Sequence, residues 1–321
     1  MPALKVIRKP LNPALKCFNL PPAKCAAAAK NLHFRIFPAH SFFTLSGNRM
    51  PLPASTSTSK ILFWVLNAFL GVAFLAEIST PKSSSALDAA TITLDAATIT
   101  LAAVASVAGL ARQLPLQNVL PTALIAALIG GLAHGLSSNS NFSIPFGPIT
   151  FSPPAGEKIF NFVPWSIPLL WVIAIFNARG VGRLILRPWR KVKNYGYWLI
   201  GLTAALATAF DLALEPYAWY VKHFWFWQRT KIPFTWEGAA LLNFVGWAFV
   251  SLLIMMFATP SLIRKQPGKS SSPDIQPLAL WLGALILFAT GSAGAGLWWP
   301  VGVDAAIAAV TTVFAVRGVK W

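Results

Sequence analysis

The chain has 321 residues, of which 56% are hydrophobic and only 11% are charged. A soluble domain carries roughly a quarter charged residues, so this composition excludes an ordinary soluble globular protein. The net charge of +17 would favour nucleic acid if it lay on one soluble surface. Here the basic residues flank long apolar runs, so we interpret them as topology signals and as contacts to anionic membrane lipid, and we expect no nucleic-acid partner.

Residues 1–59 form a basic tail that is rich in Pro, Ala and Ser and has no acidic residue. Three interpretations remain open: a disordered basic arm, an organelle transit peptide, or an upstream extension of a protein whose translation starts at Met50. Each of them makes 60–321 the transmembrane helical domain. Cys17 and Cys25, the only cysteines, both lie in this tail, so they support neither a disulfide framework nor a metal site in the helical domain.

From residue 60 onward the chain is divided into apolar segments near the length that crosses a bilayer as a helix. These eight predicted spans are 61–78, 90–111, 119–136, 160–176, 196–215, 239–259, 278–296 and 299–316. We therefore predict an all-α polytopic membrane protein with about eight transmembrane helices.

The distribution of Lys and Arg predicts how these spans are oriented. If the N-terminus is inside, 21 of the 26 basic residues lie in inner segments and 5 in outer loops. Positively charged loops stay in the cytoplasm, so both the N- and the C-terminus are expected there. The cytoplasmic (inner) membrane of a bacterium is the expected location.

A tandem repeat begins the second predicted span, because Leu87–Thr93 and Leu94–Thr100 are the same heptapeptide, LDAATIT. Seven residues make almost two helical turns, so Asp88 and Asp95 fall on nearly the same helix face. We interpret the repeat as a duplication that was tolerated because it preserves that face.

Asp211 and Glu215 are one turn apart near the end of the fifth predicted span. Ionisable groups within the hydrocarbon region are costly and mark a functional interior by default. Two carboxyls this close repel each other when both are ionised, so we expect one of them to hold a proton and to be able to act as a general acid.

An aromatic segment follows these carboxyls: nine of the twenty residues 217–236 are Tyr, Trp or Phe. Such residues are typical of an aromatic belt at the membrane interface. Ring faces can also line a pocket for a flat polyene and stabilise a carbocation. The sequence leaves both interpretations open.

Five motifs follow one another along the chain: IPFG at Ile144–Gly147, VPWSIPLLW at Val163–Trp171, DLALEP at Asp211–Pro216, FWFW at Phe224–Trp227 and NFVGW at Asn243–Trp247. Their order and spacing resemble the integral membrane carotenoid biosynthesis proteins, a family that includes gamma-carotene and bisanhydrobacterioruberin hydratases. The resemblance covers about residues 120–255. The family's Tyr-x-Tyr pair after IPFG is replaced by Ile149, Thr150 and Phe151.

This resemblance implies a carotenoid hydratase, a hydro-lyase that hydrates the terminal C=C of a linear (ψ) carotenoid end group. Protonation of the alkene gives a tertiary carbocation, which a water molecule captures as a tertiary alcohol. Asp211 and Glu215 would act as acid and base, in either order. Asn243 would orient the water, and His134 is a reserve proton carrier.

The resemblance also implies a substrate-binding set of aromatic side chains. Trp225, Trp227 and Trp247 could stabilise the cation through their ring faces. Phe146 and Trp171, from the IPFG and VPWSIPLLW motifs, complete the set.

No metal and no cofactor are expected, because hydration requires neither and the chain has only four histidines, two of them in the tail. The expected partners are a carotenoid or other isoprenoid lipid, membrane lipid and other carotenoid enzymes. Two alternatives from other classes stay open. One is a transporter or proton-coupled carrier with an acidic relay, and the other is a non-catalytic carotenoid- or lipid-binding membrane protein.

Overall fold

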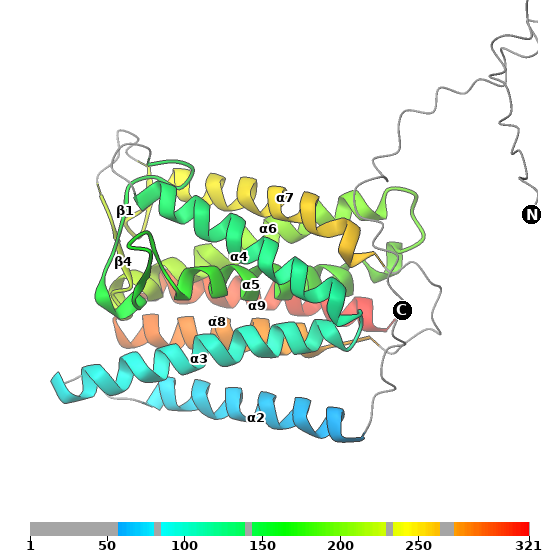
Figure 1. The fold of residues 1–321 in the computed structure, drawn as a ribbon, viewed down its shortest axis with the longest axis horizontal. Coiled ribbons are helices and arrows are strands. Elements are labelled where there is room, and N and C mark those ends of the chain that lie inside the picture. Colours follow the sequence, from blue (N-terminus) through cyan, green and yellow to red (C-terminus); the bar gives the residue numbers. More distant parts are fainter. Residues whose placement is uncertain (1–56, 80–84, 139–142, 229–233, 264–272, 321) are drawn as a thin grey trace, which may run out of the picture. The chain divides into compact units, whose positions relative to one another are not determined.

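The computed structural model describes residues 57–79, 85–138, 143–228, 234–263 and 273–320, and within them it contains eight α-helices (Figure 1). The predicted all-α class is thereby confirmed. The helices are α2 (Ser57–Ser79), α3 (Ser85–Ala111), α4 (Leu116–Ser138), α5 (Ser166–Ile185), α6 (Tyr195–Pro216), α7 (Leu241–Leu262), α8 (Gln276–Gly294) and α9 (Trp298–Val319).

Seven helices of this described part, α3 to α9, contain a segment long and apolar enough to cross a membrane. The apolar segment found in α2, Phe63–Ala76, is shorter. These helices make the chain a polytopic integral membrane protein, as predicted. The predicted location of both termini in the cytoplasm stays a prediction, and the prediction for residues 1–59 falls almost wholly outside the described residues.

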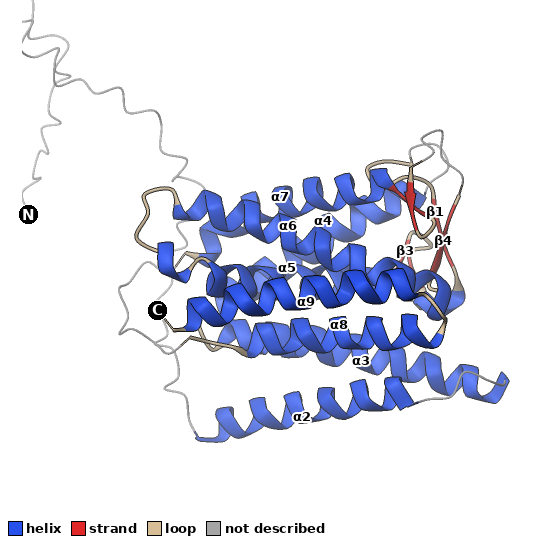
Figure 2. Cartoon of the chain, turned by 180° about the vertical axis from the view of Figure 1, so that it is seen from behind, coloured by secondary structure: helices blue, strands red, loops and turns tan. Residues whose placement is uncertain are grey.

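Helix α5 lies at the centre of the helical unit and packs against α3, α4, α6, α8 and α9 (Figures 1 and 2). Every residue from Leu170 to Arg179 is buried. Contacts with five neighbouring helices bury α5 on all sides, including its polar residues Asn177 and Arg179.

The bounds of α5 differ from the predicted span 160–176. Phe160 and Asn161 adopt left-handed backbone conformations, and β3 (Val163–Pro164) then pairs with β2 (Lys158–Ile159). The helix continues instead through Arg179, which is buried and donates from Nη2 to the carbonyl oxygen of Leu262 at 3.1 Å. Leu262 is the last residue of α7, whose final carbonyls have no partner within their own helix. A buried arginine is thus accommodated because it satisfies the end of a neighbouring helix.

Three short antiparallel strand pairs, which the sequence does not predict, supplement the helices. The one important for function joins β1 (Ile149–Phe151) to β4 (Trp225–Trp227), at one end of the helices (Figures 1 and 2). Phe151 lies opposite Trp225, and Ile149 opposite Trp227. A third pair joins β5 (Thr235–Trp236) to β6 (Ala239–Ala240). The β1–β4 pairing holds together two connections that are far apart in the sequence.

Close approach of α4 to α5 requires a glycine at position 130. A Cβ at Gly130 would overlap the indole ring of Trp171, so we expect Gly130→Ala to destabilise the protein by about 1–3 kcal/mol through overpacking. Thermal unfolding of the purified protein in detergent measures this. Gly201→Ala in α6 is the matched control, because nothing lies within 4 Å of a Cβ there. An equal loss of stability in both variants would contradict the prediction.

Candidate functional site

Asp211 and Glu215, the carboxyl pair, lie on one face of α6 and are bridged by an amide. Their side chains are 0% and 2% exposed. Asn243, at the start of α7 and equally buried, donates from Nδ2 to Asp211 Oδ2 at 2.6 Å and to Glu215 Oε1 at 3.1 Å. The predicted juxtaposition of the two carboxyls is thus accompanied by a donor from the next helix.

Glu215 receives two further donors from β4. The Nε1 atoms of Trp225 and Trp227 donate to Glu215 Oε2 at 3.1 Å and 2.8 Å. Alternate residues of a strand share one face, which explains why both indoles reach the same oxygen. With Asn243, Glu215 accepts three N–H groups across both oxygens. Such an arrangement suits a carboxylate, which can only accept.

Asp211 has fewer partners than Glu215. Its Oδ1 atom is buried and has no hydrogen-bond partner among the described residues, and the same holds for Asn243 Oδ1 and Trp247 Nε1. Asn243 and Trp247 are one turn apart on α7, on the same side of that helix. Buried polar atoms are normally satisfied by protein or water, so each of these three atoms can take a further polar partner.

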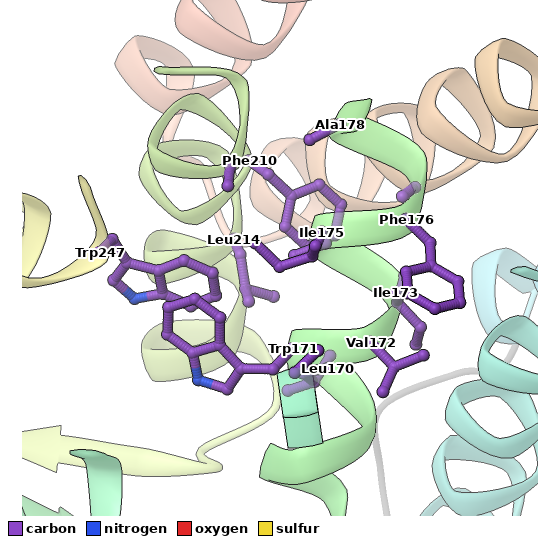
Figure 3. Close-up of a cluster of buried hydrophobic side chains, with 14 of the residues drawn as sticks. Leu170, Trp171, Val172, Ile173, Ile175, Phe176, Ala178, Phe210, Leu214 and Trp247 are labelled. Atoms are coloured by element: carbon purple, nitrogen blue, oxygen red, sulfur yellow. The ribbon is translucent and has the colours of Figure 1, made fainter. Parts of the chain in front are cut away.

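An aromatic cluster adjoins the carboxyl pair. The indole rings of Trp171 and Trp247, the indole stack, lie 3.9 Å apart at 17° (Figure 3). Trp171 Nε1 donates to His134 Nδ1 at 3.1 Å. The same nitrogen lies 3.3 Å from the carbonyl oxygen of Gly130. Phe146 packs against His134 with ring centroids 4.1 Å apart.

Phe146 reaches this cluster because its neighbours are small or polar. Its backbone N–H donates to Ser137 Oγ at 3.1 Å. On the other side lies Gly246 of α7, where a Cβ would meet the Phe146 ring and the Pro145 carbonyl oxygen. The IPFG and NFVGW motifs are therefore in contact, which gives a structural reason for the glycine between Val245 and Trp247.

Phe151 joins the two halves of the site, although the sequence alone does not single it out. Its ring lies 6.4 Å from the ring of His134 and 6.4 Å from that of Trp225, edge-on to the latter at 86°. The sequence signal at this position is the replacement of the family's Tyr-x-Tyr pair by Ile149, Thr150 and Phe151, and strand alternation directs the side chains of Ile149 and Phe151 to the same side.

The structure thus brings together all nine residues predicted for the site. Five form the hydrogen-bonded network, and four belong to the aromatic cluster beside it. They are Asp211, Glu215, Asn243, Trp225 and Trp227, and then His134, Phe146, Trp171 and Trp247. Within the described ranges, no three His, Cys, Asp or Glu side chains gather so that they could hold a metal ion.

Fold and site together define a class: a helical integral membrane protein with a buried pair of carboxyls enclosed by aromatic side chains. Residues 89–311 match the family described as carotenoid biosynthesis protein. The chain belongs to that family, and the match extends beyond the predicted 120–255. None of the curated proteins and none of the solved structures compared with the chain matches it. A role in carotenoid biosynthesis follows from the family.

Proposed function

We propose that this protein hydrates the terminal C=C bond of a linear carotenoid end group, and that it does so in the cytoplasmic membrane of a bacterium. One observation carries the proposal: two buried carboxyls share an amide donor but differ in their other partners. Hydration of an unactivated alkene needs both a proton donor and a held water molecule, and the difference between Asp211 and Glu215 supplies a reason to separate these tasks.

Asp211 is the proposed general acid. Glu215 accepts three N–H groups across both oxygens, and these contacts favour its carboxylate form over one that carries an O–H. The proton that the pair shares is therefore carried by Asp211, on the oxygen without a partner. Transfer of this proton to the CH carbon of the terminal double bond breaks the O–H bond, forms a C–H bond and leaves a tertiary carbocation at the dimethyl-substituted end carbon.

Water capture completes the reaction. Asn243, which is hydrogen-bonded to Asp211, and Trp247, one turn further along α7, provide an unpartnered acceptor at Oδ1 and an unpartnered donor at Nε1, and a water molecule held for attack needs such partners. Its oxygen forms the C–O bond, and the surplus proton returns to the Asp211 carboxylate. The sum is alkene plus water giving a tertiary alcohol, with the acid regenerated, and no cofactor takes part.

The aromatic side chains have different tasks in this proposal. Trp225 and Trp227 present their N–H edges to Glu215 and fix its carboxylate. The negative charge of Glu215 and the ring faces of Trp247 and Phe151 then stabilise the cation, since a cation over an aromatic ring gains about 0.5–2 kcal/mol. His134, already engaged by Trp171, positions the indole stack and is a reserve proton carrier.

Expression of the full-length chain in a bacterium that makes lycopene or gamma-carotene tests the proposal. We expect a product heavier than the substrate by one water, with a tertiary alcohol at the end group, by chromatography and mass spectrometry. If the protein is in the membrane and neither carotenoid gains water, the hydratase proposal fails. In that case a transporter or a non-catalytic carotenoid-binding protein accounts for the family membership instead.

A further inference from the structure

An apolar pocket lies between α3, α5, α6 and α8, and no part of the proposed reaction uses it. Phe210 and Leu214 of α6 line this apolar pocket, and they are the immediate neighbours of Asp211 and Glu215. Successive residues of a helix point about 100° apart. Helix α6 thus presents the carboxyl pair on one side and the pocket on another.

Helix α5 divides the same two regions. Trp171 and Ile173 lie on opposite sides of this helix (Figure 3). Trp171 belongs to the indole stack, whereas Ile173 lines the pocket. The pocket is therefore a second site and not an extension of the aromatic cluster.

The wall of the pocket is suited to a conjugated hydrocarbon chain. Its aromatic members are Phe74, Phe210, Tyr217, Phe224 and Phe288. Aliphatic side chains of α3, α5, α6 and α8 form most of the remainder, with Asp95, Thr98 and Asn177 as its polar members. Flat ring faces pack well on a flat π-system, and aromatic contacts contribute beyond the area they bury.

The charge at one end of the pocket is already balanced. Asp95, which lines the pocket, forms an ion pair with Lys222, whose Nζ lies 2.5 Å from Asp95 Oδ1. Both side chains are largely buried, at 8% and 13% exposed, and the Lys222 ammonium also lies 5.8 Å from the Tyr217 ring centroid. A ligand with a charged head would have to bury a further charge here, which is costly. An uncharged hydrocarbon end adds none.

The length of the pocket limits how much of a chain it holds. Along α5 it extends from Leu170 to Asn177, which is roughly 10 Å at the helical rise. A full carotenoid polyene is longer, so one end inserts and the remainder stays outside. Phe74, Ile99 and Leu280 line the pocket but are only partly buried, which gives the chain a route from the surrounding lipid.

We propose that this pocket is a docking site for one uncharged end of a linear carotenoid, separate from the carboxyl pair. That the ligand is a carotenoid rests on the proposed function. That the docking site lies in this pocket rests on the side chains that line it. The aromatic ring faces favour a flat polyene over the flexible acyl chain of a fatty acid or phospholipid.

Lycopene retained by the protein purified from a lycopene-producing bacterium tests this docking site. The full-length chain is extracted in mild detergent, and the bound carotenoid per protein, lycopene together with any hydrated product, is read from the absorbance. Ala284→Phe fills the pocket from α8, and Ala102→Phe fills it from α3. We expect each to lower bound lycopene by about tenfold, which corresponds to about 1.4 kcal/mol of binding free energy.

Matched controls lie on the same two helices, because Ala279 of α8 and Ala97 of α3 are exposed. Ala279→Phe and Ala97→Phe should retain lycopene at the wild-type level. Asp211→Asn should also retain bound carotenoid while it forms no hydrated product. This variant therefore distinguishes a loss of reaction from a loss of docking. The docking site is overturned if both pocket variants keep lycopene, or if added oleate displaces lycopene from the wild-type protein.

Discussion

Asp211→Asn is expected to abolish carotenoid hydration while leaving the protein folded. The asparagine amide oxygen can still accept from Asn243, and its NH2 group takes the place of the oxygen that has no partner. The acidic proton is lost, and general acid catalysis contributes about 10²–10⁴-fold to a rate. The measurement is the fraction of lycopene or gamma-carotene converted to the hydrated product at equal amounts of membrane protein.

Asp304→Asn is the matched control for this loss. Asp304 lies on α9, is 1% exposed, and neither of its carboxylate oxygens has a hydrogen-bond partner in the described part of the chain. It shares burial and residue type with Asp211 but lies outside the hydrogen-bonded network, so its variant should hydrate at the wild-type rate. Hydration by Asp211→Asn at that same rate would remove Asp211 from the mechanism.

Glu215→Gln is expected to act differently and to cost stability as well as activity. Three N–H donors, from Trp225, Trp227 and Asn243, point at the two oxygens of Glu215. A glutamine puts its NH2 group against at least one of them, and a buried donor left without an acceptor costs about 1–3 kcal/mol. We expect a clear drop in the melting temperature of the protein purified in detergent, together with loss of the hydrated product.

Glu157→Gln makes the same chemical change on an exposed side chain and should melt as the wild type does. Both carboxyl variants are therefore expected to be inactive, but they differ in stability. Asp211→Asn stays folded, whereas Glu215→Gln is destabilised. If Glu215→Gln were stable and Asp211→Asn unfolded, the assignment of acid and carboxylate to the two residues would have to be exchanged.

Much of the helical arrangement is predictable because apolar run length alone identifies helices that cross a bilayer. The limit of this rule is visible at α5. Hydropathy cannot tell that FNFVPW before Ser166 forms a turn and a strand, because these residues are as apolar as the helix that follows. Nor can it predict that Arg179 stays inside the helix, since this depends on a carbonyl oxygen of Leu262 more than eighty positions away.

The carboxyl pair is predictable for a local reason, because its two members are one turn apart on one helix. The N–H donors that distinguish Asp211 from Glu215 cannot be predicted in this way. Trp225 and Trp227 reach Glu215 through strand pairing with Ile149–Phe151, and Asn243 reaches it from another helix. Phe151 is missed for the same reason: a three-residue strand leaves little periodicity in the sequence, and its partner strand lies far along the chain.

The dependence of Glu215 on later residues also has a consequence for biosynthesis. Its three donors lie at positions 225, 227 and 243, so all of them are translated after α6. When α6 first enters the bilayer, this acidic side chain has none of its final partners, and an isolated charge in hydrocarbon is costly. Helix α6 is therefore expected to wait beside the insertion machinery until α7 has been made, and the two helices enter the lipid as a pair.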